Sequence, residues 1–344
     1  MTHLLRARLE ELLCAFPAVG VAVVGDFALD AYWVADMTRS ELSRETPRFP
    51  LPIVQESYSP GAAGNVAANV AALGVRRVFA ISILGDDWRG RILREELAQR
   101  GVEVGTLLTA PGRVTCAYIK PIRRGYNSEQ EDARLDFDNY TPLAAETEDR
   151  LLATVADSLR YVGAVAVCDQ MAQGVLTPRV REGLIRLARE HPHIFFCADS
   201  RYRIGLFSDM MLKPNELEAA RAHRPDRQPQ TLTRAELEAI GLELARQARR
   251  PVYITIGADG ALLFADDRCE HLPAPRAQPP IDTVGAGDTF LSALCAGLAA
   301  GASPAEAGAL ANLATAVTIK KLNTTGTASP TELRAKYEEV QREW

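Results

Sequence analysis

Short apolar runs alternate with longer amphipathic stretches along most of the chain. The run Val19 to Val24 ends at Gly25-Asp26, and similar runs at 164–169 and 194–200 each precede an amphipathic stretch. A continuous apolar run of this length is typical of a strand buried on both faces, as in a parallel sheet. Strands that alternate with helices predict βαβ units. We therefore expect an α/β fold with a mostly parallel central sheet, followed by a helical region from Ala286 onward.

Two segments interrupt this alternation. Residues 31–58 and 113–138 carry prolines, alternating polar positions and short β-like runs in place of helical periodicity. Such segments are typical of exposed or edge strands, so we expect them to form one small β-sheet from separate insertions. Residues 1–344 are otherwise predicted to be a single domain. A polar, proline-containing segment at 223–234 is expected to be a surface loop.

Composition and charge exclude several classes of function. The 344 residues are 47% hydrophobic and 24% charged, with a formal net charge of −5, which is an ordinary globular balance. No broad basic face is implied, so we expect no nucleic-acid partner. No apolar run reaches the ~18 residues of a membrane span, so we expect no membrane association. The six cysteines lack metal-binding spacing, which favours reduced thiols and a cytoplasmic location.

The stretch DTVGAGDTFLSALCAGLAAG, residues 282–301, passes from polar and small residues into an apolar helical pattern. A helix begins with unpaired N–H groups and a partial positive charge. Gly285, Ala286 and Gly287 leave those groups accessible, which predicts an anion pocket suited to phosphate. Asp288 beside it is suited to accept a proton from an attacking hydroxyl. The alternative for Asp288 is an ordinary helix cap.

The sequence resembles the ribokinase-like, or PfkB, family of sugar kinases over nearly its whole length. The segments that carry the resemblance occur in the family's order: VVGDFALDAYW, PGAAGNVAANVAALG, KPNELEA, TIGADG, DTVGAGDTF and ALANLATAV. The first and last pieces look most similar to the kinase domain of heptose 7-phosphate kinase/ADP-heptose synthase proteins. The resemblance implies a three-layer α/β/α sandwich with a small β-sheet lid made from about 31–58 and 113–138.

The resemblance also implies a set of catalytic and acceptor-binding residues. Asp288 would be the general base, and Gly285, Ala286 and Gly287 the anion hole. The positions that match acceptor-binding sites are Asp30, Gly61, Asn65, Asp169 and Arg134. The alternatives are a solvated aspartate at Asp30 and a solvated arginine at Arg134. The chain has GAAGN where relatives have GGAAN or GGKGAN, and DQMAQG where heptose kinases have DYAKG.

A further set of residues is implied for the nucleotide and for cations. The nucleotide-binding positions are Asn215, Thr255, Gly257, Gly260 and Asn312. Glu218 would hold Mg²⁺ through water, and Asp282 would contact a monovalent cation such as K⁺, together with residues near Thr325 to Ser329. The alternatives are a capping pair for Asn215 and Glu218, and a simple turn at Asp282.

We therefore expect an ATP- and Mg²⁺-dependent kinase that phosphorylates a hydroxyl of a sugar or sugar phosphate. Two alternatives remain open: a nucleoside or other small-alcohol kinase of the same fold, and a catalytically silent sugar-binding regulator. The intact base, anion hole and N-x-x-E pair argue against the regulator. In relatives the lid often pairs with the lid of a second subunit, so the resemblance implies a homodimer.

Overall fold

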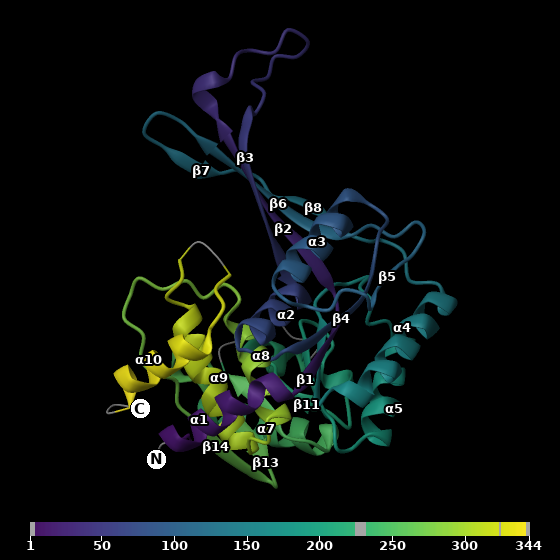
Figure 1. The fold of residues 1–344 in the computed structure, drawn as a ribbon, viewed down its shortest axis with the longest axis vertical. Coiled ribbons are helices and arrows are strands. Elements are labelled where there is room, and N and C mark those ends of the chain that lie inside the picture. The colour runs from purple at the N-terminus through teal and green to yellow at the C-terminus, as the bar shows by residue number, and fades with distance from the viewer. Residues whose placement is uncertain (1–3, 224–231, 323–324, 342–344) are drawn as a thin grey trace.

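Two separate β-sheets organise the molecule (Figure 1). The structure is a computed structural model that describes residues 4–223, 232–322 and 325–341. Most of the surface loop predicted at 223–234 therefore lies outside the described residues. No helix within the described ranges is long and apolar enough to cross a membrane.

The larger sheet forms the centre of the molecule and is mostly parallel. Its strands follow the order β14-β13-β12-β11-β10-β9-β1-β4-β5. The pairings of β13 with β12 and with β14 are antiparallel, so β13 runs opposite to the other strands of this sheet. The strands are β1 (Gly20–Gly25), β4 (Arg77–Leu84), β5 (Leu107–Thr109), β9 (Ala164–Asp169), β10 (Phe195–Ser200), β11 (Met211–Leu212), β12 (Val252–Thr255), β13 (Ala261–Ala265) and β14 (Arg268–Leu272).

Helices cover both faces of this sheet, because its strands are apolar on both sides. In β1, Val21 and Val23 face one hydrophobic core and Ala22 and Val24 face the other, as the two-residue period of a strand requires. The first core is covered by α1 (Arg6–Ala15), α2 (Ala63–Ala72), α3 (Trp88–Gln99), α8 (Ala286–Ala299), α9 (Pro304–Thr318) and α10 (Pro330–Val340). The second is covered by α4 (Ala145–Ser158), α5 (Pro178–Glu190), α6 (Glu216–His223) and α7 (Arg234–Ala248). The predicted α/β/α layering is confirmed.

The smaller sheet, which we call the lid sheet, projects from the body of the molecule in Figure 1. It consists of β2 (Phe27–Asp36), β3 (Ile53–Ala62), β6 (Cys116–Arg124), β7 (Glu129–Glu131) and β8 (Leu135–Phe137). β2 pairs with β3 antiparallel and with β6 parallel. β2 and β3 extend beyond the 31–58 segment, because apolar residues near Ala28 and Gly61 continue the pairing into the core.

Small residues let α2 and α8 pack closely beneath the lid sheet. The Ser292 hydroxyl on α8 donates to the carbonyl oxygen of Val66 on α2 at 3.0 Å, and the Thr289 hydroxyl donates to the Asn69 side chain at 3.3 Å. Both contacts are buried, where hydrogen-bonding groups need partners. The close packing brings the first turns of the two helices together at one end of the central sheet.

Candidate active site

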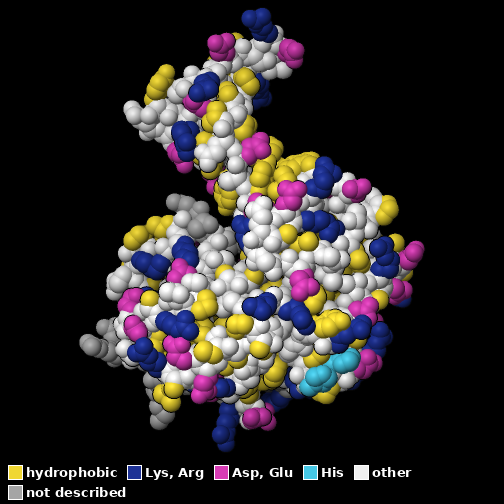
Figure 2. Space-filling view, in the orientation of Figure 1, with side chains coloured by type: hydrophobic (Ala, Val, Ile, Leu, Met, Phe, Trp, Pro, Cys, Tyr) yellow, Lys and Arg dark blue, Asp and Glu magenta, His cyan; other side chains and the backbone are white. Residues whose placement is uncertain are grey.

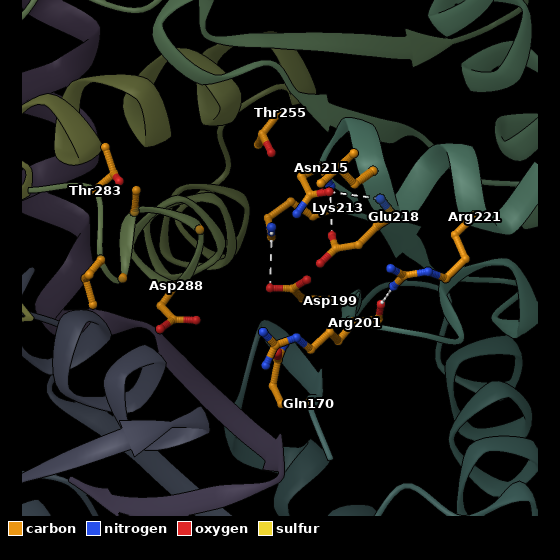
Figure 3. A pocket seen from close by; sticks show the side chains of 15 residues that line it. Gln170, Asp199, Arg201, Lys213, Asn215, Glu218, Arg221, Thr255, Thr283 and Asp288 are labelled. Atoms are coloured by element: carbon orange, nitrogen blue, oxygen red, sulfur yellow. Dashed lines mark hydrogen bonds and ion pairs between the residues drawn. The ribbon is translucent and has the colours of Figure 1, made fainter. Parts of the chain in front are cut away.

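A pocket of about 650 Å³ opens where the carboxyl ends of the parallel strands meet the first turn of α8. Ligands in open α/β sheets bind at this edge. Figure 3 shows side chains from several strand ends converging on it. Its lining residues are Gln170, Asp199, Arg201, Lys213, Asn215, Leu217, Glu218, Arg221, Thr255, Thr283, Val284, Gly285, Ala286, Gly287 and Asp288.

The first turn of α8 presents free backbone amides to this pocket. Gly285 has φ +76°, and a Cβ there would lie 2.5 Å from the Thr325 Cγ2, so the turn requires glycine. The Ala286 amide already donates to the Thr283 carbonyl at 3.1 Å. The amides of Gly285, Gly287 and Asp288 have no acceptor among the described residues. Of the three residues predicted as the anion hole, the two glycines therefore have amides available for a ligand.

Asp288 is a half-buried carboxylate at the pocket wall. The Asn65 amide donates to its Oδ2 at 3.3 Å. Burial, followed by the negative charge of Asp199, raises the pKa of Asp288 to about 7, although Lys213 and the Asn65 hydrogen bond act in the opposite direction. A carboxylate with a pKa near neutrality is well matched to proton transfer at physiological pH. Sequence reasoning predicted both Asp288 and Asn65, and the structure brings them into contact.

A buried ion pair that sequence reasoning missed lies opposite Asp288. Lys213 Nζ is 3.3 Å from Asp199 Oδ2, and both side chains are under 10% exposed. Burial lowers the pKa of Lys213, but the carboxylates of Asp199, Glu218 and Asp288 outweigh it, so the net pKa is raised. Lys213 is therefore a fixed positive charge beside Gly287. The signal in the sequence was a charged residue at the end of each of two apolar runs: Asp199 in CADS and Lys213 in LKPN.

Asn215 and Glu218 form a reciprocal cap at the start of α6. The backbone amide of Asn215 donates to Glu218 Oε2 at 2.8 Å, and the backbone amide of Glu218 donates to Asn215 Oδ1 at 2.9 Å. The capping alternative is thus realised, yet both residues also line the pocket. Burial and the charge of Asp199 raise the pKa of Glu218. The neighbouring carboxylates of Asp199 and Glu218 therefore repel each other, so a cation beside them is favoured.

A second pocket of about 320 Å³ continues from the first turn of α8 toward α9. All five predicted nucleotide positions line it: Asn215, Thr255, Gly257, Gly260 and Asn312. Asn312 is buried, and its amide donates to the carbonyls of Leu272 and Pro273 at 2.8 and 3.3 Å. Asn312 thus holds the end of β14, a strand that the sequence pattern did not predict.

Two of the predicted acceptor residues, Asp30 and Gly61, lie on the lid sheet, in β2 and β3. A Cβ on Gly61 would lie 2.7 Å from Asp30 Oδ2, so glycine leaves room for that carboxylate. Lys120 Nζ is 3.9 Å from Asp30 Oδ1 and donates to the Tyr32 hydroxyl at 3.0 Å. Burial raises the pKa of Asp30, and the charges of Lys120 and Arg134 act against this shift. Sequence reasoning missed Lys120.

Arg134 and Asp169 occupy different environments from each other. Arg134 makes two 2.6 Å hydrogen bonds to Asp136 and lies over the Tyr118 ring at 4.6 Å, near the acceptor residues. Asp169 is fully buried and accepts from the Ser200 hydroxyl at 2.6 Å and from the Arg203 guanidinium. It does not line either pocket described above, so its carboxylate is occupied within the protein.

Asp282 begins the turn that leads into α8. Its Oδ1 accepts from the Val284 amide at 3.0 Å, and its own amide donates to the Ile319 carbonyl at 2.8 Å. The turn expected as the alternative is therefore present. A separate pocket of about 440 Å³ joins Asp282, Val284 and Thr325 to the lid residues Tyr32 and Lys120. Asp282 thus lies between the first turn of α8 and the lid sheet.

Comparison with known proteins identifies the family. A pfkB family carbohydrate kinase profile matches residues 51–332, most of the chain. The chain belongs to the pfkB family of carbohydrate kinases. The pocket at the strand ends, with the glycine turn and Asp288, is the candidate active site of this family member.

Curated relatives and solved structures agree with this family. The chain is 33% identical over 336 residues to "Bifunctional protein HldE" of Geotalea uraniireducens and 34% identical over 344 residues to that of Stutzerimonas stutzeri. These matches cover 96% and 95% of this chain but 65% of each relative. Ribokinase of Thermotoga maritima has a similar fold (TM-score 0.65, 19% identity), covering 93% of this chain and 99% of that one. Phosphofructokinase-2 of Escherichia coli is similar too (TM-score 0.70, 19% identity), covering 94% and 100%.

Proposed function

We propose that this carbohydrate kinase transfers the γ-phosphoryl group of ATP to a hydroxyl of a sugar phosphate of the heptose 7-phosphate type. The observation that carries the mechanism is Asp288: a half-buried carboxylate with a pKa of about 7, beside free amides at the start of α8. The sequence resemblance to heptose 7-phosphate kinase domains supports the acceptor class. The matched relatives are longer than this chain, so their complete activities are not assumed for it.

Two basic residues under the lid sheet support a phosphorylated acceptor. Lys120 and Arg134 both lie near Asp30, and both lower its otherwise raised pKa. Asp30 would accept hydrogen bonds from sugar hydroxyls, while the ammonium and guanidinium groups would bind the phosphate that the acceptor already carries. Gly61 and Asn65 would complete the sugar contacts, and we leave Asp169 out of this set.

In the proposed reaction, Asp288 takes the proton of the acceptor hydroxyl while that oxygen bonds to the γ-phosphorus. The amides of Gly285 and Gly287, with Lys213, hold the charge on the transferring group. Asp199, Glu218 and Asn215 would hold Mg²⁺ through water, because burial and the negative charge of Asp199 raise the pKa of Glu218, and Lys213 offsets this charge only in part. Bound Mg²⁺ would neutralise the phosphate oxygens of ATP. The described residues form no larger metal-binding cluster, as expected for an ion held largely by water and phosphate.

The pocket toward α9 is the proposed position of the nucleotide base. Thr255, Gly257 and Gly260 would border the phosphates, and Asn312 the far side of the nucleotide. Asp282 and the segment Thr325 to Ser329 would hold a monovalent cation next to α8. K⁺ would then raise kcat relative to Li⁺, which can be measured by exchanging the chloride salts in the assay.

We further propose that two copies of the chain associate through their lid sheets. β3 is an edge strand, and its first residues are exposed. Long unprotected edge strands readily pair with another chain. Hydrophobic side chains lie along the projecting sheet in Figure 2, and Phe49 and Val54 are 61% and 50% exposed. Val54→Asp should convert the dimer to a monomer in analytical ultracentrifugation, whereas a monomeric parent protein would contradict the proposal.

All six cysteines are free thiols. This supports the proposal that the protein works in the reducing cytoplasm.

The function is tested by measuring ADP release with Mg·ATP and K⁺ against paired acceptors. Each pair contains a sugar phosphate, such as a heptose or hexose phosphate, and the same sugar without its phosphate. We expect turnover with phosphorylated members, and a loss of about 10⁴-fold in kcat for Asp288→Asn. A preference for the free sugars would overturn the acceptor class. Turnover of nucleosides alone, or ATP binding without any turnover, would favour the two alternative functions.

A further inference from the structure

The loop that follows β10 has an unusually well fixed backbone. The Arg201 amide donates to the Asp169 carbonyl at 3.0 Å, and its own carbonyl accepts from the Arg221 guanidinium at 2.7 Å. The Arg203 amide donates to the Ser200 hydroxyl oxygen at 2.9 Å. The main chain at Arg201 is therefore held on both sides and has little freedom to move.

Asp169 and Arg203 explain why this loop is held so firmly. The Arg203 guanidinium binds both oxygens of the fully buried Asp169 and also donates to the Met171 carbonyl at 2.7 Å. A buried ion pair gives little net stability because both ions lose their hydration, but it defines geometry when its remaining hydrogen bonds are satisfied. The pair thus joins the loops after β9 and β10 into one support beneath the pocket.

The side chain of Arg201 contrasts with this fixed backbone. Its guanidinium forms no hydrogen bond or ion pair with any part of the chain that the structure describes, and it lines the pocket (Figure 3). Its positive charge reaches Glu218 and acts against the burial and the charge of Asp199 that raise the pKa of this carboxyl. The other two cations of the pocket are engaged: Lys213 with Asp199, and Arg221 with the Arg201 carbonyl.

The charges around the pocket indicate what this guanidinium is for. Asp199, Glu218 and Asp288 all face the space in which a phosphoryl group must move. Three carboxylates would repel negative oxygens, and the single charge of Lys213 offsets only one of them. A phosphoryl group in transit spreads its charge over three oxygens. A planar guanidinium offers several donors that suit such oxygens better than an ammonium does.

We propose that Arg201 is a catalytic residue that binds the oxygens of the phosphoryl group during its transfer. The assignment rests on the kinase function proposed above. The acceptor hydroxyl loses its proton to Asp288, its oxygen bonds to the γ-phosphorus, and the bond from that phosphorus to the bridging oxygen breaks, leaving the electron pair on ADP. Arg201 donates hydrogen bonds throughout and is not consumed. The fixed backbone holds its side chain ready, so little rearrangement is needed at the moment of reaction.

The phosphate already present on the acceptor is a different ligand. That group would be bound by Lys120 and Arg134 on the lid sheet, beside Asp30. Arg201 lines the pocket with the α8 amides and Asp288, and Lys120 lines a different pocket with Tyr32. We therefore assign Arg201 to the transferring group.

Three variants test this proposal: Arg201→Ala, Arg201→Lys and Arg186→Ala. Arg186 is an exposed arginine on α5 outside the pocket, so its loss removes the same charge without touching the site. For Arg201→Ala we expect kcat to fall by about 100-fold or more, while KM for Mg·ATP and the Kd of Mg·ADP change by less than about threefold. Arg201→Lys should retain an intermediate rate, and added guanidinium ion should partly restore Arg201→Ala. Arg186→Ala should behave as the parent protein.

Two kinetic results would overturn the assignment. If Arg201→Ala leaves kcat intact but raises KM only for phosphorylated acceptors, Arg201 binds the acceptor phosphate. If neither parameter changes, it is a solvated surface arginine.

Binding of Mg·ADP with aluminium fluoride, which mimics the phosphoryl group in transit, gives an answer without turnover. Arg201→Ala should weaken that complex by about 100-fold but not Mg·ADP alone, and equal affinities would contradict the proposal even if no acceptor is phosphorylated. Thermal unfolding of each variant checks that the fold is kept.

Discussion

The ion pairs of the pocket at the strand ends and those of the lid sheet differ in how far they are exposed to water. At the strand ends, Lys213 and Asp199 are almost fully buried and matched to each other. On the lid sheet, ion pairs such as Arg124 with Glu129 are about half exposed. Buried charges keep a fixed geometry, whereas exposed pairs are screened by water and contribute little.

This difference separates two tasks within one kinase. The strand ends and the first turn of α8 belong to the packed body, so the groups proposed for phosphoryl transfer are held rigidly. The lid sheet carries Lys120 and Arg134, which are proposed to select the acceptor. Substitutions at the strand ends should therefore change kcat, and substitutions on the lid sheet should change KM for the acceptor.

Of the changes that test this comparison, the largest effect is expected from a methyl group added in the first turn of α8. In Gly285→Ala, the new methyl group meets the Thr325 Cγ2 and the backbone must keep φ +76°. The turn should shift and misplace its amides, lowering kcat by about 100-fold or more with a modest change in acceptor KM. Adding Thr325→Ser removes the opposing methyl group and should recover part of the loss. Steady-state kinetics of the single and double variants check this, and a double variant no better than Gly285→Ala would argue against the steric explanation.

An intermediate effect is expected from the lid sheet. Lys120→Met keeps the length of the side chain but removes the charge beside Asp30. A charge-assisted hydrogen bond contributes about 1.5–3 kcal/mol, so KM for a phosphorylated acceptor should rise by about 10- to 100-fold with kcat nearly unchanged. Arg124→Met, on the same strand but paired outward with Glu129, is the matched control. A fall in kcat without a rise in KM would remove the division of tasks.

The smallest expected effect is a pH dependence set by Asp288. Because burial and the charge of Asp199 raise the pKa of Asp288 to about 7, the free enzyme loses its ionised base below that pH. The ratio kcat/KM for the acceptor should fall about tenfold per pH unit on the acid side and be flat just above pH 7. Asp199→Asn removes one cause of the raised pKa, so the acid limb should move to lower pH. A limb that does not move would mean that another group controls the rate.

Sequence reasoning could locate the glycine turn and Asp288 because the signal there is local, while their catalytic roles stay predictions. The glycine turn and Asp288 lie within one nine-residue segment, and the strands that lead to the site are continuous apolar runs, so both could be predicted. Lys213 and Asp199 could not, because each looks like a polar residue at the end of a strand. Their partnership depends on β10 and β11 being neighbours in the sheet.

Asp169 shows that a residue can match a substrate-facing position in the sequence and still be occupied by a distant partner. Its place at the end of β9 matched a substrate-facing position, but Arg203, 34 residues later, occupies its carboxylate. Ala286 was predicted as part of the anion hole, yet a turn to Thr283 occupies its amide. β14 is short and polar, with only Leu272 fully buried, so it gave no periodic signal. In each case the deciding contact comes from the tertiary fold or from turn geometry.

The direct passage of β3 into α2 has a mechanical consequence. β3 ends at Ala62 and α2 begins at Ala63, with Ala62 at φ +50° as the only joint between them. With so short a connection, a movement of β3 would be passed on to α2. If the lid sheet moves toward a bound sugar, α2 would turn with it, and Asn65 in the first turn of α2 would shift against Asp288. Binding of the proposed acceptor would then change the hydrogen bond between Asn65 and Asp288, and with it the basicity of the proposed general base.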